Sequence, residues 1–140
     1  MNVLVKIVVA LIIGFVCHQS EAQNKHNIIV TVKNANSNEG KMFIALYKTE
    51  SSFLNTTYKA VKSEIKDNQC TITFEDIPDG IYAVSIFHDE NNNGKLDSNF
   101  FGIPKEDYGC SNNAKGFMGP PKWEDAKFQL NKNESLTIKL

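Results

Sequence analysis

The chain has 140 residues and a formal net charge of −1 at pH 7, and all 15 of its Lys+Arg residues are lysines. Proteins that read nucleic acids use a basic surface and the forked guanidinium group of arginine, so the composition excludes nucleic acid as a partner. The length allows one domain of ordinary size.

The N-terminal segment has the order of charge, apolar run and small residues that is typical of a secretory signal peptide. Lys6 is the only charged residue before an apolar run at residues 7–16, and small residues precede a cut after Ala22. The order therefore predicts a signal peptide at residues 1–22 and a single mature domain at residues 23–140.

The apolar run is too short to span a bilayer, which takes about 20 apolar residues, so no transmembrane anchor is expected in the mature chain. A lipid anchor on Cys17 is disfavoured because Phe15 and Val16 stand where that signal requires small residues. We expect an exported protein, periplasmic or extracellular, with association to the outer membrane left open.

Seven runs of the mature chain alternate apolar with other residues at period two, as β-strands do. They fall at residues 28–32, 42–46, 61–65, 70–74, 81–88, 126–130 and 136–140. The pattern predicts an all-β fold, an antiparallel β-sandwich of about seven strands with a prealbumin-like or immunoglobulin-like shape. The residues expected in the core are Ile28, Val30, Val32, Ile44, Phe74, Ile86, Phe128 and Ile138.

The run at residues 81–88 is apolar on both faces, so both faces should be covered. The cover expected for the second face is the segment at residues 97–125, which holds four of the eight glycines, three of the four prolines and five of the 14 aromatic residues. We interpret it as a long ordered loop packed on the sheet, before the C-terminal strand pair. A set of short extra strands is the alternative.

Residues 89–97 have the spacing of a calcium-binding loop, with hard oxygen ligands at alternate positions and a glycine at the turn. The candidate metal ligands are Asp89, Asn91, Asn93, the Lys95 carbonyl and Asp97. The twelfth position is Phe100 and not glutamate, and the loop follows a strand, which excludes a true EF-hand. An ordinary Asn-Gly hairpin turn without metal is the alternative.

Three residues are candidates for ligand binding or chemistry: His88, Tyr108 and Trp123. A histidine beside a carboxylate, as in His88-Asp89, is a common arrangement for a general base. The mature chain has only one other histidine and no nucleophile elbow, which disfavours catalysis. Tyr108 and Trp123 could stack on a glycan or a peptide, or could simply fix the long loop to the sheet.

Two cysteines remain after the predicted cut, Cys70 and Cys110. Cys70 alternates with apolar residues of its strand, so it is expected in the core as a small hydrophobic side chain. Export permits a disulfide between the two, and the sequence leaves that pairing open because it does not supply the distance between their Cα atoms.

A series of motifs resembles a bacterial secreted family catalogued as domain of unknown function 2141, in order and in spacing. The motifs are Phe87-His88-Asp89-Glu90-Asn91-Asn92-Asn93-Gly94-Lys95-Leu96-Asp97, Gly102-Ile103-Pro104-Lys105-Glu106, Tyr108-Gly109-Cys110-Ser111-Asn112-Asn113 and Gly119-Pro120-Pro121. The resemblance implies an all-β, transthyretin-like or immunoglobulin-like sandwich and an exported protein, and it implies no specific activity.

Two functions remain as hypotheses. The first is a non-catalytic secreted or periplasmic module that binds or scaffolds a glycan, peptide or protein ligand, with calcium ordering its long loop. The second is a small metal-dependent hydrolase that uses His88, Asp89 and Asp97.

Overall fold

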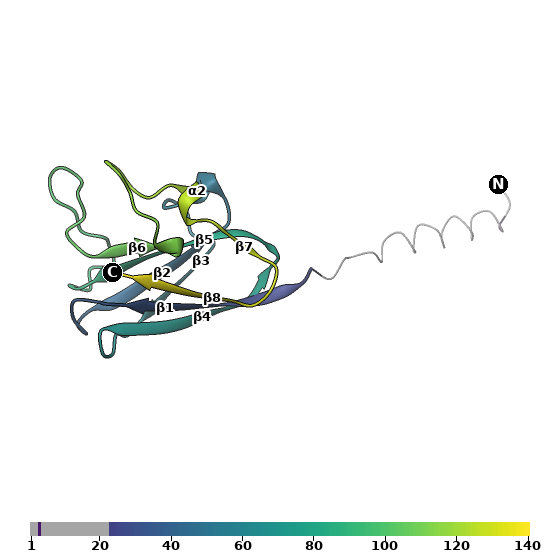
Figure 1. Cartoon of the computed structure of the whole chain (residues 1–140), viewed down its shortest axis with the longest axis horizontal. Coiled ribbons are helices and arrows are strands. Elements are labelled where there is room, and N and C mark those ends of the chain that lie inside the picture. The colour runs from purple at the N-terminus through teal and green to yellow at the C-terminus, as the bar shows by residue number, and fades with distance from the viewer. Residues whose placement is uncertain (1–2, 4–22) are drawn as a thin grey trace.

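The structure is a computed structural model, and it describes Val3 and residues 23–140. The predicted signal peptide lies outside the described residues, apart from Val3. Two β-sheets face each other as the two layers of a sandwich (Figure 1). No helix of the described part is long and apolar enough to cross a bilayer.

The first sheet has three strands in the order β4–β1–β8. These are β1 (Lys25–Lys33), β4 (Gln69–Pro78) and β8 (Glu134–Lys139). The second sheet has the order β3–β2–β5–β6, with β7 paired to the other end of β5. Its strands are β2 (Lys41–Tyr47), β3 (Lys59–Ser63), β5 (Gly80–Asp89), β6 (Tyr108–Cys110) and β7 (Phe128–Leu130).

Three short helices lie in the connections of the second sheet. They are η1 (Glu50–Ser52), η2 (Ser111–Asn113) and α2 (Trp123–Ala126). η2 and α2 belong to the segment predicted as one long loop, and β6 lies there as well. The segment therefore combines both interpretations, since ordered loops alternate with short regular elements.

The core lies between the sheets and confirms the predicted alternation. Seven of the eight residues expected there are buried: Ile28, Val30, Val32, Ile44, Phe74, Ile86 and Ile138. Phe128 is only half-buried at the edge of the core, and Leu130, two residues later, is fully buried. Burial of one face at period two requires this register, because a shift by one residue would expose the whole apolar set.

The fold class is confirmed, with three corrections of detail. The structure has eight strands, because β6 adds one to the predicted set. One pair is parallel, since β8 runs alongside β1 in the same direction. Ala126 ends α2 and so lies outside the strand predicted at residues 126–130, which starts at Phe128.

Both faces of β5 are apolar, as predicted, but the cover of the outer face differs from the expectation. Trp123 and Ala126 cover Ala83 and Tyr47 in a second, smaller apolar cluster. The other large aromatics of the segment do not pack there: Phe100, Phe101 and Phe117 are exposed. The middle of the outer face is therefore left open.

Cys70 and Cys110 do not form a disulfide. Cys70 lies in the main core and Cys110 in the smaller cluster, and both are buried free thiols. Burial raises the pKa of the Cys110 thiol to about 12, so the thiol stays protonated and is a poor nucleophile at neutral pH.

Candidate functional site

A row of small side chains runs across the open part of the outer face. The register places Ala60 of β3, Ala45 of β2, Ser85 of β5 and Cys110 of β6 side by side. Neighbouring strands lie about 4.8 Å apart, so the row crosses about 14 Å of sheet. Small side chains in four adjacent strands make a low floor between taller neighbours.

An aromatic row borders this floor on one side. Phe43, Phe87 and Tyr108 pair across three strands, two residues from the floor residues of the same strands. The rings of Phe43 and Phe87 stack with centroids 4.7 Å apart, and the Lys62 ammonium lies 4.5 Å from the Phe43 centroid. This row forms one wall of a trough across the sheet.

The opposite wall is Tyr47, which is held from behind. Phe53 meets the Tyr47 ring edge-on at 5.4 Å, and Trp123 meets Phe53 at 5.7 Å. The Ser85 hydroxyl donates to the Tyr47 hydroxyl at 3.3 Å. Trp123 is thus a support for the wall and does not line the trough.

Two loops rise over the trough and turn it into a cleft of about 990 Å³. One loop contributes residues from Leu96 to Pro104, and the other contributes residues from Gly116 to Pro121. No lining residue carries a charge, and the side-chain polar groups are the hydroxyls of Tyr47, Thr57, Ser85 and Tyr108 and the thiol of Cys110. The cleft therefore offers an apolar surface with a few neutral polar groups.

The first loop begins with the predicted metal-binding residues, and the structure brings Asp89, Asn91, Asn93 and Asp97 together. The buried Asp89 carboxylate accepts hydrogen bonds from the backbone N–H groups of Asn93 and Gly94, at 3.1 and 2.8 Å. The Asn93 side-chain amide donates to both Asp97 oxygens, at 2.9 and 3.0 Å, and the Asn91 amide donates to one at 2.5 Å. Gly94 has a φ of +80°, which glycine adopts without strain.

These contacts also lower the pKa of Asp97. The hydrogen bonds from Asn93 and then Asn91 are the main causes, and Lys105 and Lys95 add weaker attraction. The carboxylate therefore stays charged in the loop at a lower pH than it would in an open chain.

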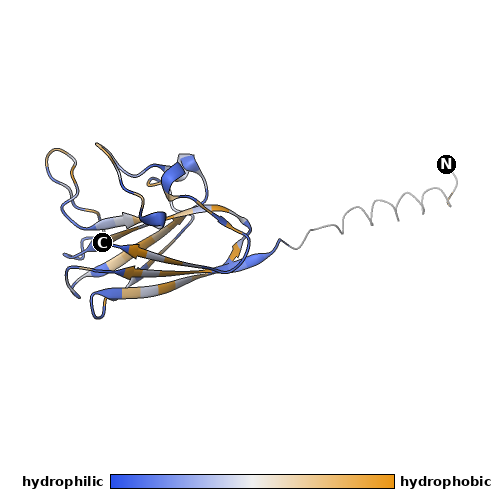
Figure 2. Ribbon diagram, in the orientation of Figure 1, coloured by the Kyte–Doolittle hydropathy of each residue, from blue (hydrophilic) through white to orange (hydrophobic). Residues whose placement is uncertain are grey.

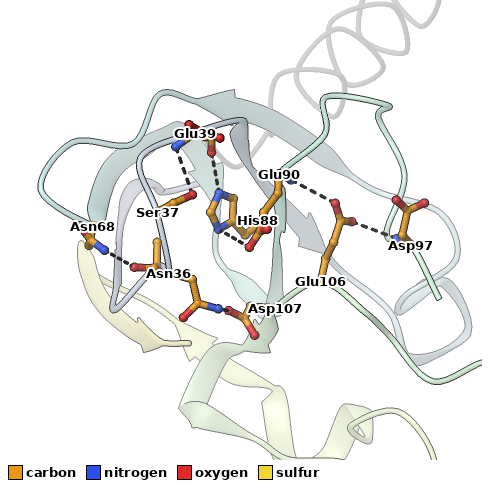
Figure 3. A network of polar contacts seen from close by, with 10 residues as sticks. Asn36, Ser37, Glu39, Asn68, His88, Glu90, Asp97, Glu106 and Asp107 are labelled. Carbon is orange, nitrogen blue, oxygen red and sulfur yellow. Dashed lines mark hydrogen bonds and ion pairs between the residues drawn. The ribbon is translucent and has the colours of Figure 1, made fainter. Parts of the chain in front are cut away.

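Glu106 closes the base of this loop, and sequence reasoning missed it. Its buried carboxylate accepts hydrogen bonds from the Glu90 N–H at 3.1 Å and from the Asp97 N–H at 3.0 Å (Figure 3). One side chain thus ties both ends of residues 90–97. The signal that could have found it was its place in the motif at residues 102–106, where glutamate follows a glycine and a proline.

His88 lies at the same end of the sandwich, and Glu90 lies between it and Glu106 in the polar network (Figure 3). It is fully buried, and its Nε2 donates to the Glu39 carbonyl at 2.7 Å. Its Nδ1 has no hydrogen-bond partner within residues 23–140, and the Glu90 carboxylate lies 3.7 Å away. Gly40, with φ +71°, packs so closely here that a Cβ would lie 2.0 Å from the Asp89 carbonyl oxygen.

His88 and Asp89 do not form a catalytic pair. Consecutive residues of β5 point to opposite faces of the sheet, so the imidazole lies on the core side and the carboxylate on the loop side. His88 is also absent from the cleft lining, whereas Tyr108 is part of it. Of the three ligand-binding candidates, the structure brings only Tyr108 to the cleft.

Two residues of the motif at 108–113, Ser111 and Asn112, make side-chain hydrogen bonds to the backbone. The buried Ser111 hydroxyl accepts from the Val84 N–H at 2.9 Å and donates to the Ala126 carbonyl at 2.5 Å. The Asn112 side chain donates to the carbonyls of Asp125 and Lys127. These contacts hold η2 and α2 against β5, at the root of the second loop.

The calcium hypothesis concerns the side-chain oxygens of Asp89, Asn91, Asn93 and Asp97 in the first loop. Within residues 23–140 no group of three or more His, Cys, Asp or Glu side chains is placed to hold a metal ion. The loop supplies two carboxylates, Asp89 and Asp97, on either side of two asparagines. Rotation of the Asn91 and Asn93 amides would turn their oxygens, in place of their N–H groups, towards an ion beside Asp97.

The comparisons with known proteins point to one family. A family model described as an uncharacterized protein conserved in bacteria (DUF2141) matches residues 30–139. No curated protein and no solved structure matches the chain. The matched residues include the cleft and both of its loops.

Proposed function

We propose a function from the premise that the chain belongs to the family described as an uncharacterized protein conserved in bacteria. The function is that of an exported, non-catalytic binding module whose cleft takes the acyl chain of a lipid or of another long apolar molecule. The observation that carries the proposal is the uncharged cleft of about 990 Å³ above a floor of small side chains.

The shape and lining of the cleft support an acyl chain. The floor is one residue wide and crosses four strands, so it suits a long and narrow ligand. A glycan would need more polar partners than the few hydroxyls that line the cleft. Apolar ligands gain free energy in proportion to the apolar area that both surfaces remove from water.

Lys62 supports a ligand with an anionic group at one end. It lies on the edge strand β3, above Phe43, at the end of the aromatic wall. A carboxylate or phosphate at the end of an acyl chain would meet the ammonium group outside the uncharged lining.

Calcium has a structural part in this proposal. An ion held by Asp89, Asn91, Asn93 and Asp97 would fix the loop that forms one side of the cleft. It would also balance the two carboxylates, which otherwise rely on backbone and amide N–H groups. The hydrolase alternative has no comparable support, because His88 and Asp89 lie on opposite faces of β5.

Ligand binding is tested with an uncharged fluorescent probe, N-phenyl-1-naphthylamine, displaced by dodecanoic acid. Ser85→Leu should fill the floor and reduce probe affinity at least tenfold, a loss of about 1.4 kcal/mol. Ser85→Ala keeps the floor low at the same position and should bind as the wild type does. Equal probe binding by all three proteins would contradict the proposal.

Export is tested separately. Mass spectrometry of the protein recovered outside the cytoplasm should find Gln23 as the first residue. An intact Met1 or a lipid on Cys17 would contradict the predicted cleavage.

A further inference from the structure

The ends of both cleft loops expose large apolar side chains. Phe100, Phe117 and Met118 are 97%, 92% and 95% exposed, and Phe101 is 82% exposed. A soluble surface carries single apolar residues without consequence, but clustered ones mark an interaction site. We call residues 98–105 and 114–122 the two tips.

The tips project from the same side of the molecule. The ribbon places the loops before β6 and before α2 next to each other over the outer sheet (Figure 1), and apolar residues occur towards the end of each (Figure 2). The cleft lies between them, since both loops contribute to its lining. The exposed rings of Phe100 and Phe117 lie outside that lining, so they face away from the cleft.

The charge of the tips is positive. They contain Lys105, Lys115 and Lys122 and no Asp or Glu. Acidic residues flank the tips without lying in them: Asp97, Glu106 and Asp107 beside the first tip, and Glu124 and Asp125 after the second. Apolar ends with lysines beside them complement a bilayer that carries anionic headgroups.

We infer that the two tips dock the domain on an anionic phospholipid bilayer. The rings of Phe100 and Phe117, which lie outside the cleft lining, enter the region between headgroups and acyl chains, where aromatic rings are favoured. The three lysines lie at the headgroup level and contact phosphates. Docking in this orientation turns the mouth of the cleft towards the lipid, although the inference stands on the tips alone and does not need an occupied cleft.

The first test is co-sedimentation of residues 23–140, which contain both sheets and the core, with vesicles. Vesicles of phosphatidylcholine and phosphatidylglycerol at a ratio of about 3:1 should carry the protein down, and phosphatidylcholine alone should bind it at least about tenfold less, as expected for surface lysines. Binding should weaken as salt rises, because salt screens the lysines.

Variants assign the binding to the tips. Phe100→Ser with Phe117→Ser should lower vesicle partitioning at least about tenfold, since each ring loses its apolar burial. Ile81→Ser, an exposed apolar residue on β5, is the matched control and should bind as the wild type does. Lys105→Gln, Lys115→Gln and Lys122→Gln together should remove the preference for anionic vesicles, whereas Lys25→Gln, Lys132→Gln and Lys139→Gln should not.

The outcomes separate this inference from the cleft proposal. The Phe100 and Phe117 variant should still bind N-phenyl-1-naphthylamine, and Ser85→Leu should still bind vesicles. Equal sedimentation of wild type and the Phe100 and Phe117 variant would overturn the inference, as would no binding to either vesicle. Self-association that depends on these two rings, without lipid, would also overturn it and assign the tips to contacts between copies.

Discussion

The two loops over the cleft expose similar apolar ends but are built in different ways. Residues 90–107 are held by hydrogen bonds at the base of the loop and again at its exposed tip. At the tip, the Asn99 side chain accepts hydrogen bonds from the N–H groups of Phe101 and Ile103. Residues 115–121, all of them described by the structure, make no hydrogen bond. This second loop is held at its C-terminal end, by its two prolines and by the buried Trp123.

The difference shows two ways to hold an exposed apolar end in place. A polar network fixes the first loop through its own backbone, and that network includes the carboxylates of Asp89, Asp97 and Glu106. The second loop relies on restricted backbone angles at Pro120 and Pro121 and on packing beyond its C-terminal end. Each way predicts a different point of failure.

Trp123→Ala should have the largest effect, because it removes the apolar contact that ends the second loop. Loss of a buried tryptophan costs about 3–5 kcal/mol, and urea unfolding measures it. Trypsin should also cut faster after Lys115. Phe117→Ala, in the same loop but exposed, should leave the free energy of unfolding unchanged, and an equal loss in both variants would contradict the described packing.

Glu106→Ala should release the base of the first loop and cost about 3 kcal/mol. It removes a charged acceptor from two backbone N–H groups, and each such bond contributes about 1.5–3 kcal/mol. Tryptic cleavage after Lys105 should become faster and cleavage after Lys115 should not. Glu124→Ala removes only an exposed ion pair with Lys127 and should cost less than about 0.5 kcal/mol.

Calcium should stabilise the first loop and leave the second unchanged. At about 100 times its dissociation constant a ligand of the folded state adds about 2.7 kcal/mol, seen as a higher Tm. Calcium should slow cleavage after Lys105 but not after Lys115. Asp89→Ala should abolish both effects, and an identical wild-type Tm in calcium and in chelator would mean that residues 89–97 are an Asn-Gly turn without metal.

The free energy of unfolding should fall at alkaline pH because of Cys110, which lies between the two loops in the sequence. Burial raises the pKa of Cys110 to about 12, so the unfolded chain, with a cysteine pKa of about 8.5, loses this proton first. Stability is therefore intact below about pH 8.5 and falls above it, by about 1 kcal/mol at pH 9 for this thiol. Cys110→Ser should show a smaller loss between pH 7.5 and 9, and an unchanged slope would contradict the assignment.

Alternation of side chains predicted the inner faces of both sheets because burial of one face imposes period two. The same signal has no direction, so it did not show that β8 runs parallel to β1. It also assigned Ala126 to a strand, because Ala126, Phe128 and Leu130 alternate as apolar residues. Ala126 is buried, as the pattern predicted, but it is buried as the last residue of α2.

The site was predicted less completely than the fold. The spacing at residues 89–97 located a loop in which Asp89 and Asp97 gather hydrogen-bond donors. Glu106 escaped because its partners Glu90 and Asp97 lie 16 and nine residues away, beyond any short motif. Phe100 and Phe117 were expected to cover the sheet because apolar composition does not distinguish a packed ring from an exposed one.

The cleft was not foreseen because it depends on register across strands. Ala60, Ala45 and Ser85 are separated widely in sequence, and only the pairing of β3, β2 and β5 puts them in one row. Each of them alone is an ordinary small residue of a strand.

The parallel pairing of the first and last strands has a consequence for how the chain acquires its fold. β1 is the middle strand of its sheet, and the Asn27 N–H donates to an Asn133 side chain 106 residues away. Until the last residues are available, one edge of β1 lacks its partner, and closing so long a loop slows assembly. Since a chain is synthesised from its N-terminus, the first sheet stays incomplete until β8 has been made. Loss of β8 by truncation would leave one edge of β1 open for pairing with other chains.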